Sequence, residues 1–216
     1  MMKKDLTELV FILDRSGSMA GLESDTIGGF NSLLTKQKLV EGEAFVTTVL
    51  FDDKYELLHD RISIKGINTI SDKEYFVRGS TALLDAIGRT ISKISNALTH
   101  TAEEQRAEKV IVVIITDGYE NASREFSYPM IKELIESKKS QGWEFMFLGA
   151  NIDAAEEGMK IGISRDRSAK YRADAHGVRT NYRTMDYIIR DFRVKGSIDG
   201  DLQKKMNEVI EDKKTT

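Results

Sequence analysis

The sequence of 216 residues has no cysteine and only one proline, Pro129. Without cysteine the chain can form no disulfide, thiolate metal site or thiol nucleophile, which agrees with a reducing compartment. The net charge of −3 is nearly balanced, so it favours neither nucleic acid nor a membrane surface as a partner. No apolar run approaches the roughly 20 residues that span a bilayer. Because the first residues also lack the apolar segment of a signal peptide, we expect a non-secreted, cytoplasmic protein.

Strand-like and helix-like patterns alternate along the chain. Apolar and β-branched runs predict strands over residues 9–13, 43–51, 56–64, 109–116 and 143–148, with a last edge strand at 168–172. Apolar residues at helical spacing predict helices over 22–38, 82–99, 130–140, 154–160 and 177–194. The connection between 43–51 and 56–64 is too short for a parallel crossover, so these strands are expected to be antiparallel. The fold class predicted is α/β: a doubly wound, Rossmann-like open sheet, mostly parallel with one antiparallel strand, and helices on both faces.

The length suits one large domain, which we expect over residues 1–195, followed by a polar C-terminal helix or tail over 196–216. One local feature conflicts with its element. Gly28 and Gly29 lie inside the predicted helix 22–38, where each costs about 1 kcal/mol of helix propensity. We expect that close packing against the sheet explains them.

The first predicted strand, Leu9 to Leu13, ends at Asp14, and Ser16 and Ser18 follow on either side of Gly17. In an open parallel sheet, ligands bind in the crevice at the carboxyl ends of the strands. One carboxylate and two hydroxyls on a tight loop supply the oxygen ligands that Mg²⁺ prefers. Taken alone, the motif fits equally well an acid that ends a strand and a serine that caps the next helix.

Two later segments change this balance. Thr81 follows Gly79 at the start of a predicted helix, and the apolar strand that ends at Thr116 is followed by Asp117 and Gly118. A chain with Asp-x-Ser-x-Ser after one strand, a Gly-x-Thr loop and a later strand ending in Asp-Gly resembles a von Willebrand factor A (VWA) domain. The resemblance covers about residues 6–195. All five positions of that family's metal-ion-dependent adhesion site are present, namely Asp14, Ser16, Ser18, Thr81 and Asp117.

The resemblance implies a Mg²⁺ or Mn²⁺ ion, with Ca²⁺ as a further option, held by the two serines and the threonine while the acids act partly through water. Such an ion keeps much of its charge and takes an Asp or Glu carboxylate from a protein partner. The implied function is a metal-dependent protein-interaction module without enzymatic activity, of a stand-alone bacterial or phage type. We expect the neighbours of the ligands on the same loops to form the partner-binding rim, namely Arg15, Met19, Ser80, Tyr119 and Glu120.

A Mg²⁺-dependent hydrolase acting on a phosphoester is the alternative, because a bound ion could polarise a phosphoryl oxygen or activate water. Ser16 occupies the position of the second acid in haloacid-dehalogenase-type phosphatases, and none of the three histidines (His59, His100 and His176) falls in a predicted metal loop. No glycine-rich nucleotide motif follows the first strand. The basic residues between 165 and 195 could contact nucleic acid, but a solvated helix face is the simpler interpretation.

Overall fold

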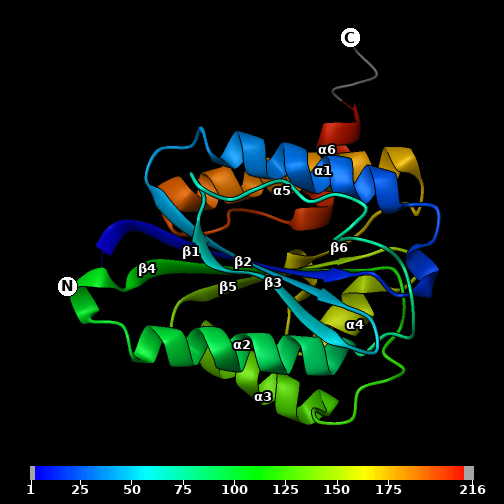
Figure 1. The fold of residues 1–216 in the computed structure, drawn as a ribbon, viewed down its shortest axis with the longest axis horizontal. Helices are drawn as coiled ribbons and strands as arrows, with labels where there is room; N and C mark the ends of the chain where they lie inside the picture. Colours follow the sequence, from blue (N-terminus) through cyan, green and yellow to red (C-terminus); the bar gives the residue numbers. More distant parts are fainter. Residues whose placement is uncertain (1–2, 212–216) are drawn as a thin grey trace.

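A six-stranded sheet forms the centre of the computed structural model, which describes residues 3–211 (Figure 1). Its strands are β1 (Lys3–Asp14), β2 (Glu43–Phe51), β3 (Tyr55–Ser63), β4 (Ala107–Thr116), β5 (Trp143–Gly149) and β6 (Ser168–Lys170). They lie in the order β3-β2-β1-β4-β5-β6, and each neighbouring pair is parallel except the antiparallel pair β2–β3. The predicted fold class is confirmed, including the single antiparallel strand at one edge.

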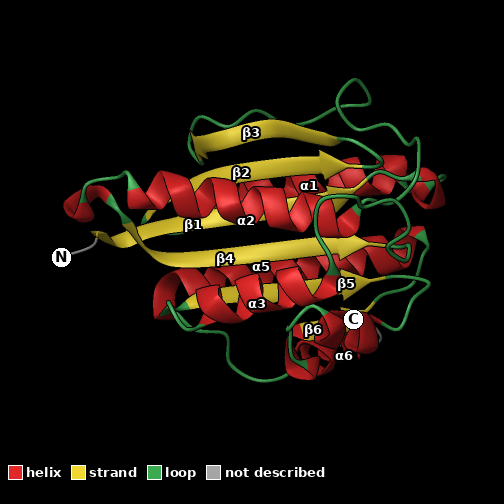
Figure 2. Ribbon diagram, turned by 90° about the horizontal axis from the view of Figure 1, so that it is seen from below, coloured by secondary structure: helices red, strands yellow, loops and turns green. Residues whose placement is uncertain are grey.

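Helices cover both faces of this sheet (Figures 1 and 2). One face carries α1 (Glu23–Gln37), α5 (Ala175–Lys195) and α6 (Leu202–Glu211), and the other carries α2 (Leu83–Thr99), α3 (Tyr128–Lys139) and α4 (Ala154–Lys160). Within the predicted C-terminal segment, α6 buries Leu202 and Met206 in the same apolar cluster as α1 and α5. The last five residues of that segment, 212–216, lie outside the described residues.

The core consists of two apolar layers, one on each side of the sheet. Alternate residues of β1 enter different layers: Phe11 lies on the side of α1 and α5, whereas Val10 and Ile12 lie on the side of α2. The Phe11 ring meets Phe30 of α1 edge to face, with 5.3 Å between ring centroids. Because both faces of β1 are covered, its apolar run is continuous rather than alternating.

The two glycines of α1 have different surroundings. A Cβ atom on Gly29 would lie 2.3 Å from the ring of Tyr182, which belongs to α5, whereas one on Gly28 would meet no atom within 4 Å. Close packing therefore explains Gly29, but the expectation of packing against the sheet was wrong, because the neighbour is another helix of the same layer. The environment of Gly28 gives no packing reason for a glycine.

A second carboxylate of β1, Glu8, is fully buried in the middle of the strand. The guanidinium of Arg61, on edge strand β3, donates to Glu8 Oε1 from Nη2 at 2.5 Å and from Nε at 3.0 Å. Arg61 has a φ angle of 50° and lies where the pairing between β2 and β3 shifts register. The irregular edge strand thus brings a positive charge to an acid in the interior.

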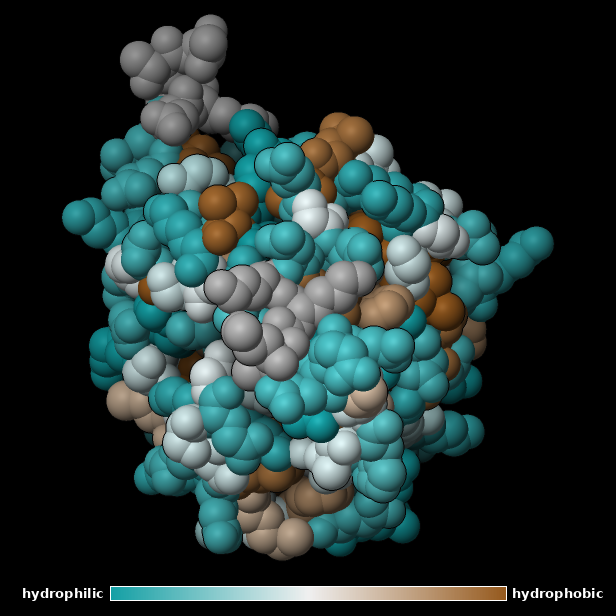
Figure 3. Space-filling view, turned by 90° about the vertical axis from the view of Figure 1, so that its left-hand side faces the viewer, coloured by the Kyte–Doolittle hydropathy of each residue, from teal (hydrophilic) through white to brown (hydrophobic). Residues whose placement is uncertain are grey.

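The amino ends and the carboxyl ends of the parallel strands form opposite edges of the molecule. The edge at which the strands begin has a mostly hydrophilic surface with separate apolar spots (Figure 3). Within residues 3–211, no helix has both the length and the apolar character needed to cross a membrane. The residues singled out in the sequence lie at the other edge, where β1 and β4 end side by side.

Candidate metal centre

The loop that follows β1 is shaped by the carboxylate of Asp14. Its Oδ1 accepts a hydrogen bond from the Ser16 backbone N–H at 2.7 Å, and its Oδ2 accepts one from the Thr116 hydroxyl at 2.6 Å. The loop continues into a short 3₁₀ turn, Gly17–Met19, whose last side chain is buried. We call residues 14–19 the serine loop. Asp14 therefore joins the serine loop to the end of β4.

Four oxygen-bearing side chains form a continuous hydrogen-bonded row. The Thr81 hydroxyl donates to Ser16 Oγ at 3.0 Å, and the hydroxyls of Ser16 and Ser18 share a hydrogen bond at 3.1 Å. Ser18 Oγ then donates to Asp117 Oδ1 at 2.5 Å. The five residues expected as metal ligands are thus brought together, four in this row and Asp14 beneath the serine loop.

The threonine loop, residues 78–82, is held by partners on both sides. Its Gly79 has a φ angle of +67°, which favours glycine, and the carbonyl of Gly79 accepts from the Gly17 N–H of the serine loop at 3.2 Å. Asn121 is bonded to Thr81 in both directions: its side-chain oxygen accepts from the Thr81 N–H at 2.9 Å, and its own N–H donates to the Thr81 carbonyl at 3.0 Å. Asn121 and Thr116 support these loops but were not predicted from the sequence.

The electrostatics of the centre depend on its two acids. Burial raises the pKa of Asp14 to about 6, although hydrogen bonds from Thr116 and Ser16 oppose this rise. Burial likewise raises the pKa of Asp117, against a hydrogen bond from Ser18. Within residues 3–211 no ion pair is formed by either carboxylate, and Asp117 Oδ2 is buried without a hydrogen-bond partner.

These observations fit a hard divalent cation. Two buried acids without a basic partner are costly, and a cation would compensate both. A glycine, Gly118, stands beside the row, where a Cβ atom would come within 3.2 Å of the hydroxyls of Ser18 and Thr81. In the described part of the chain no three His, Asp or Glu side chains are grouped to hold a metal, so hydroxyl oxygens must supply part of any ligand set here. Hydroxyls and carboxylates are the donor types that Mg²⁺ and Mn²⁺ accept.

The expected partner-binding rim needs correction at three positions. Arg15 and Met19 are 0 % and 1 % exposed, so neither can contact a partner. Glu120 is half-buried and its carboxylate is used internally, because it accepts from the N–H groups of Leu84 in α2 and of Ala122 and Ser123 in its own loop, and from the Ser123 hydroxyl. Ser80 and Tyr119 are exposed, the latter by 54 %. Of the five predicted rim residues, these two are free to contact a partner.

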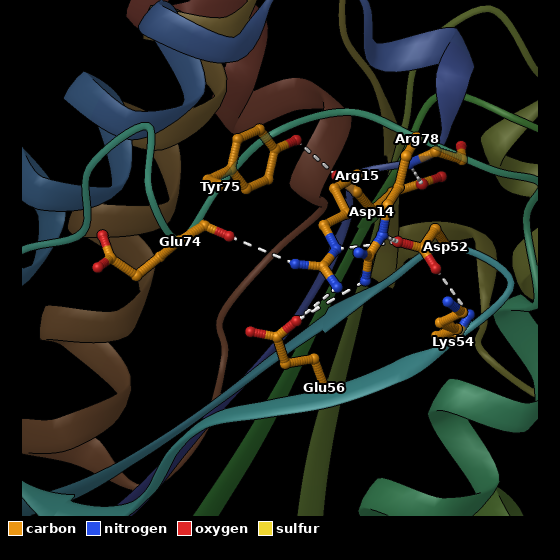
Figure 4. Close-up of polar contacts among 9 residues, drawn as sticks. Asp14, Arg15, Asp52, Lys54, Glu56, Glu74, Tyr75 and Arg78 are labelled. Carbon is orange, nitrogen blue, oxygen red and sulfur yellow. Dashed lines mark hydrogen bonds and ion pairs between the residues drawn. The ribbon is translucent and has the colours of Figure 1, made fainter.

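Arg15 belongs instead to a partly buried ionic network behind the serine loop (Figure 4). Its Nε donates to Asp52 Oδ2 at 3.0 Å and its Nη2 to Glu56 Oε2 at 2.6 Å. Arg78 Nε donates to the same Asp52 oxygen at 2.6 Å. Burial would raise the pKa of Asp52, but the hydrogen bonds from Arg78 and the Lys54 N–H, with the charge of Arg15, hold that pKa below its usual value.

Two aromatic side chains complete the surroundings of this network. The Tyr75 hydroxyl donates to the carbonyl oxygen of Asp14 at 2.6 Å. The Phe76 ring lies 5.3 Å from the guanidinium carbon of Arg15 and 5.1 Å from that of Arg78. Both rings come from the segment that precedes the threonine loop, so that segment supports the serine loop from behind.

Comparison with solved structures shows which known fold this is. The chain is similar to a von Willebrand factor type A protein from Catenulispora acidiphila, with 16 % identity, a TM-score of 0.58, and coverage of 87 % of this chain and 42 % of that one. It is also similar to manganese-loaded TRAP protein from Plasmodium vivax, with 16 % identity, a TM-score of 0.57, and coverage of 82 % and 72 %. The fold is that of a VWA domain.

A third VWA-fold neighbour is proximal thread matrix protein 1 from the mussel byssus, described with a zinc-occupied MIDAS motif (the metal-ion-dependent adhesion site). It has 14 % identity, a TM-score of 0.55, and coverage of 88 % of this chain and 47 % of that one. No protein-family model and no curated protein matches the sequence. The chain spans less than half the length of the first solved structures that it matches. At these identities the likeness establishes the VWA fold.

Proposed function

We propose that this chain is a metal-dependent protein-interaction module. Ser16, Ser18 and Thr81 would supply hydroxyl ligands to a divalent cation, and Asp14 and Asp117 would supply the negative charge, partly through water. The observation that carries the proposal is the row of four oxygen-bearing side chains that ends at Asp117, whose second carboxylate oxygen is buried and unpartnered.

The ion proposed is Mg²⁺ or Mn²⁺, with Ca²⁺ as a further option. Hard oxygen donors are compatible with all three ions. Two of the similar structures are described with a metal, manganese in one and zinc in the other, which supports a divalent cation without selecting one. Because the direct ligands would be mainly neutral hydroxyls, with the acids acting partly through water, an ion in this site would keep much of its positive charge and attract a further anionic ligand.

The partner proposed is a protein that presents an Asp or Glu carboxylate to the ion. Ser18 in the row is exposed, as are Ser80 and Tyr119 next to Thr81 and Gly118 in the sequence, and all three are available for contact with such a partner. The role of the chain's own residues is to orient the ion and to exclude other ligands on its buried side. We propose binding without turnover, in the cytoplasm of a bacterium or in a phage-infected cell.

A capture experiment tests this proposal. The full chain, immobilised, is exposed to a native bacterial lysate in Mg²⁺ and in EDTA, beside Asp14→Ala and the control Glu8→Gln, which alters a buried acid outside the centre. A partner retained by the wild type and the control in Mg²⁺, and lost in EDTA and with Asp14→Ala, supports the proposal. A partner that binds equally well in EDTA contradicts it. Metal-dependent release of phosphate from phosphoesters would favour the hydrolase instead.

A further inference from the structure

Asp52 occupies a central place between the two loops that carry the proposed ligands. It lies directly after β2 and is fully buried. Its Oδ2 accepts from Arg15 at 3.0 Å and from Arg78 at 2.6 Å, and its Oδ1 accepts from the Lys54 N–H at 2.7 Å. Its backbone carbonyl accepts from the Ala82 N–H at 2.9 Å. Every acceptor of this residue is therefore used to hold neighbouring segments.

The two arginines bonded to Asp52 come from the two ligand-bearing loops. Arg15 lies between Asp14 and Ser16 in the serine loop, and Arg78 begins the threonine loop three residues before Thr81. The Arg78 N–H also donates to the Arg15 carbonyl at 2.9 Å. The two loops are therefore joined through their backbones and again through one shared carboxylate.

The charges of this network balance one another. Arg15 and Arg78 each carry a positive charge, and Asp52 and Glu56 supply two negative ones within ion-pairing distance. The arginines are consequently not available to compensate Asp14 or Asp117, and they do not add an unbalanced positive charge next to a cation site. Removing Asp52 would leave two cations facing Glu56 alone.

We propose that Asp52 is a positioning residue for the metal centre: through Arg15 and Arg78 its carboxylate holds the serine loop against the threonine loop, so that Ser16 and Thr81 are in place before an ion binds. This inference rests on the proposed function. Supporting residues behind metal ligands typically alter metal affinity by about 10–100-fold.

The test is the affinity of the full chain for Mn²⁺, measured by titration calorimetry for the wild type, Asp52→Asn and the matched control Glu8→Gln. Glu8 is also fully buried and is also paired with an arginine, Arg61, but it lies in the middle of β1. We expect Asp52→Asn to weaken Mn²⁺ binding by about tenfold or more, and Glu8→Gln to change it by less than about twofold. Thermal unfolding of each variant records the loss of stability separately.

A second variant covers the case in which Asp52→Asn does not fold. Arg78 is half-exposed, so Arg78→Met removes the same link between the loops from its outer end. We expect it to weaken Mn²⁺ binding by severalfold. Where Asp52→Asn folds, the two losses in the double variant should be less than multiplicative, because both changes break one connection. Fully multiplicative losses would show that Asp52 does not act through Arg78.

The outcomes separate the two proposals. If the wild type does not bind Mn²⁺, the proposed function fails and this inference fails with it. If the wild type binds and Asp52→Asn or Arg78→Met binds within about twofold of it, only the positioning role is overturned. If Glu8→Gln weakens Mn²⁺ binding as much as Asp52→Asn, the effect follows general stability, and the positioning role is likewise overturned.

Discussion

Strand β1 carries two buried acids, Glu8 and Asp14, and only Glu8 is paired with a basic side chain. Burial raises the pKa of both, and for Glu8 the hydrogen bonds and charge of Arg61 oppose the rise. Asp14 receives a hydroxyl and a backbone N–H but has no ion pair with a described residue, and Asp117 beside it is in the same position. The chain supplies its own cation to the middle of the strand and none to its end. Uncompensated buried carboxylates in a polar crevice are typical of functional sites.

Among changes to these two acids, Asp14→Ala should have the largest effect on metal binding. It removes a negative charge from the centre. It also removes the carboxylate that accepts hydrogen bonds from the Ser16 N–H and the Thr116 hydroxyl, and so frees the serine loop from the end of β4. We expect Mn²⁺ affinity to fall by more than the roughly 10–100-fold typical of a supporting residue, whereas Glu8→Gln keeps it. Calorimetric titration of both variants measures this. Equal losses would show that the two acids do not differ in function.

In the absence of metal, Asp14 should make the protein less stable as the pH rises. Its folded pKa, about 6, exceeds the ordinary value of 3.8, so the native state keeps a proton that the unfolded chain loses. The cost is absent below about pH 4 and complete above about pH 6, and corresponds to about 3 kcal/mol. Asp14→Asn should therefore be more stable than the wild type by up to about 3 kcal/mol in EDTA near pH 7.5, with the difference vanishing toward pH 4. Urea unfolding across this range measures it, and a pH-independent difference would contradict the assignment.

Addition of a divalent ion should stabilise the protein by a comparable amount. At about 100 times the dissociation constant, a ligand bound only by the native state adds about 2.7 kcal/mol. For a chain of this size that corresponds to a rise in Tm of about 5–10 °C. Scanning calorimetry with Mg²⁺ and with EDTA measures the shift, which Glu8→Gln should retain and Asp117→Asn should lose. A shift retained by Asp117→Asn would place the ion elsewhere.

The internally compensated acid should matter for stability alone. Glu8→Gln leaves the Arg61 guanidinium without its charged acceptor, and since Arg61 is partly exposed it can reach water. We expect a loss of about 1–3 kcal/mol in the free energy of unfolding. Urea unfolding measures this loss, and an unchanged Mn²⁺ affinity in the same variant sharpens the contrast with Asp14. A stability equal to the wild type would mean that the Arg61 pair contributes nothing net.

The smallest change in stability is expected for a substitution in α1, away from both acids. Gly28→Ala meets no atom within 4 Å and should raise the free energy of unfolding by about 0.5–1 kcal/mol. Gly29→Ala would place a methyl group against the Tyr182 ring and should lower stability instead. Neither change should alter Mn²⁺ affinity in the folded protein. A change in affinity that follows stability in this pair would argue that the centre simply reports global stability.

The elements of the fold were largely predictable because their signals are local. The range predicted for β2 matches the structure at both ends, as does that for α4, and the β2–β3 hairpin followed from loop length. The approach of the serine loop, Thr81 and Asp117 was predictable for a different reason. The strands that end at Asp14 and Asp117 share one edge of a parallel sheet, whereas Thr81 was assigned to the centre by the resemblance to VWA domains.

What failed depends on contacts between distant residues. Arg15 lies beside metal-ligand candidates in the sequence, but the two acids that accept its hydrogen bonds are 37 and 41 residues away. Nothing in the sequence near Thr116 or Asn121 indicates that they bind Asp14 and Thr81, since these pairs are 102 and 40 residues apart. Likewise, the need for a glycine at position 29 is explained only by the Tyr182 ring packed against it. Local patterns predict the element and the position of a side chain, but they do not identify the distant residues that contact it.

The form of the two sheet edges has a consequence for assembly. Strand β3 shifts register twice along β2, and β6, at the opposite edge, is only three residues long. Neither border offers the long, flat series of free amide and carbonyl groups onto which an incoming peptide adds as an extra strand. The protein is thus protected against edge-to-edge fibre growth, and recruitment by β-augmentation is disfavoured. Binding partners are left with the loops and helical surfaces.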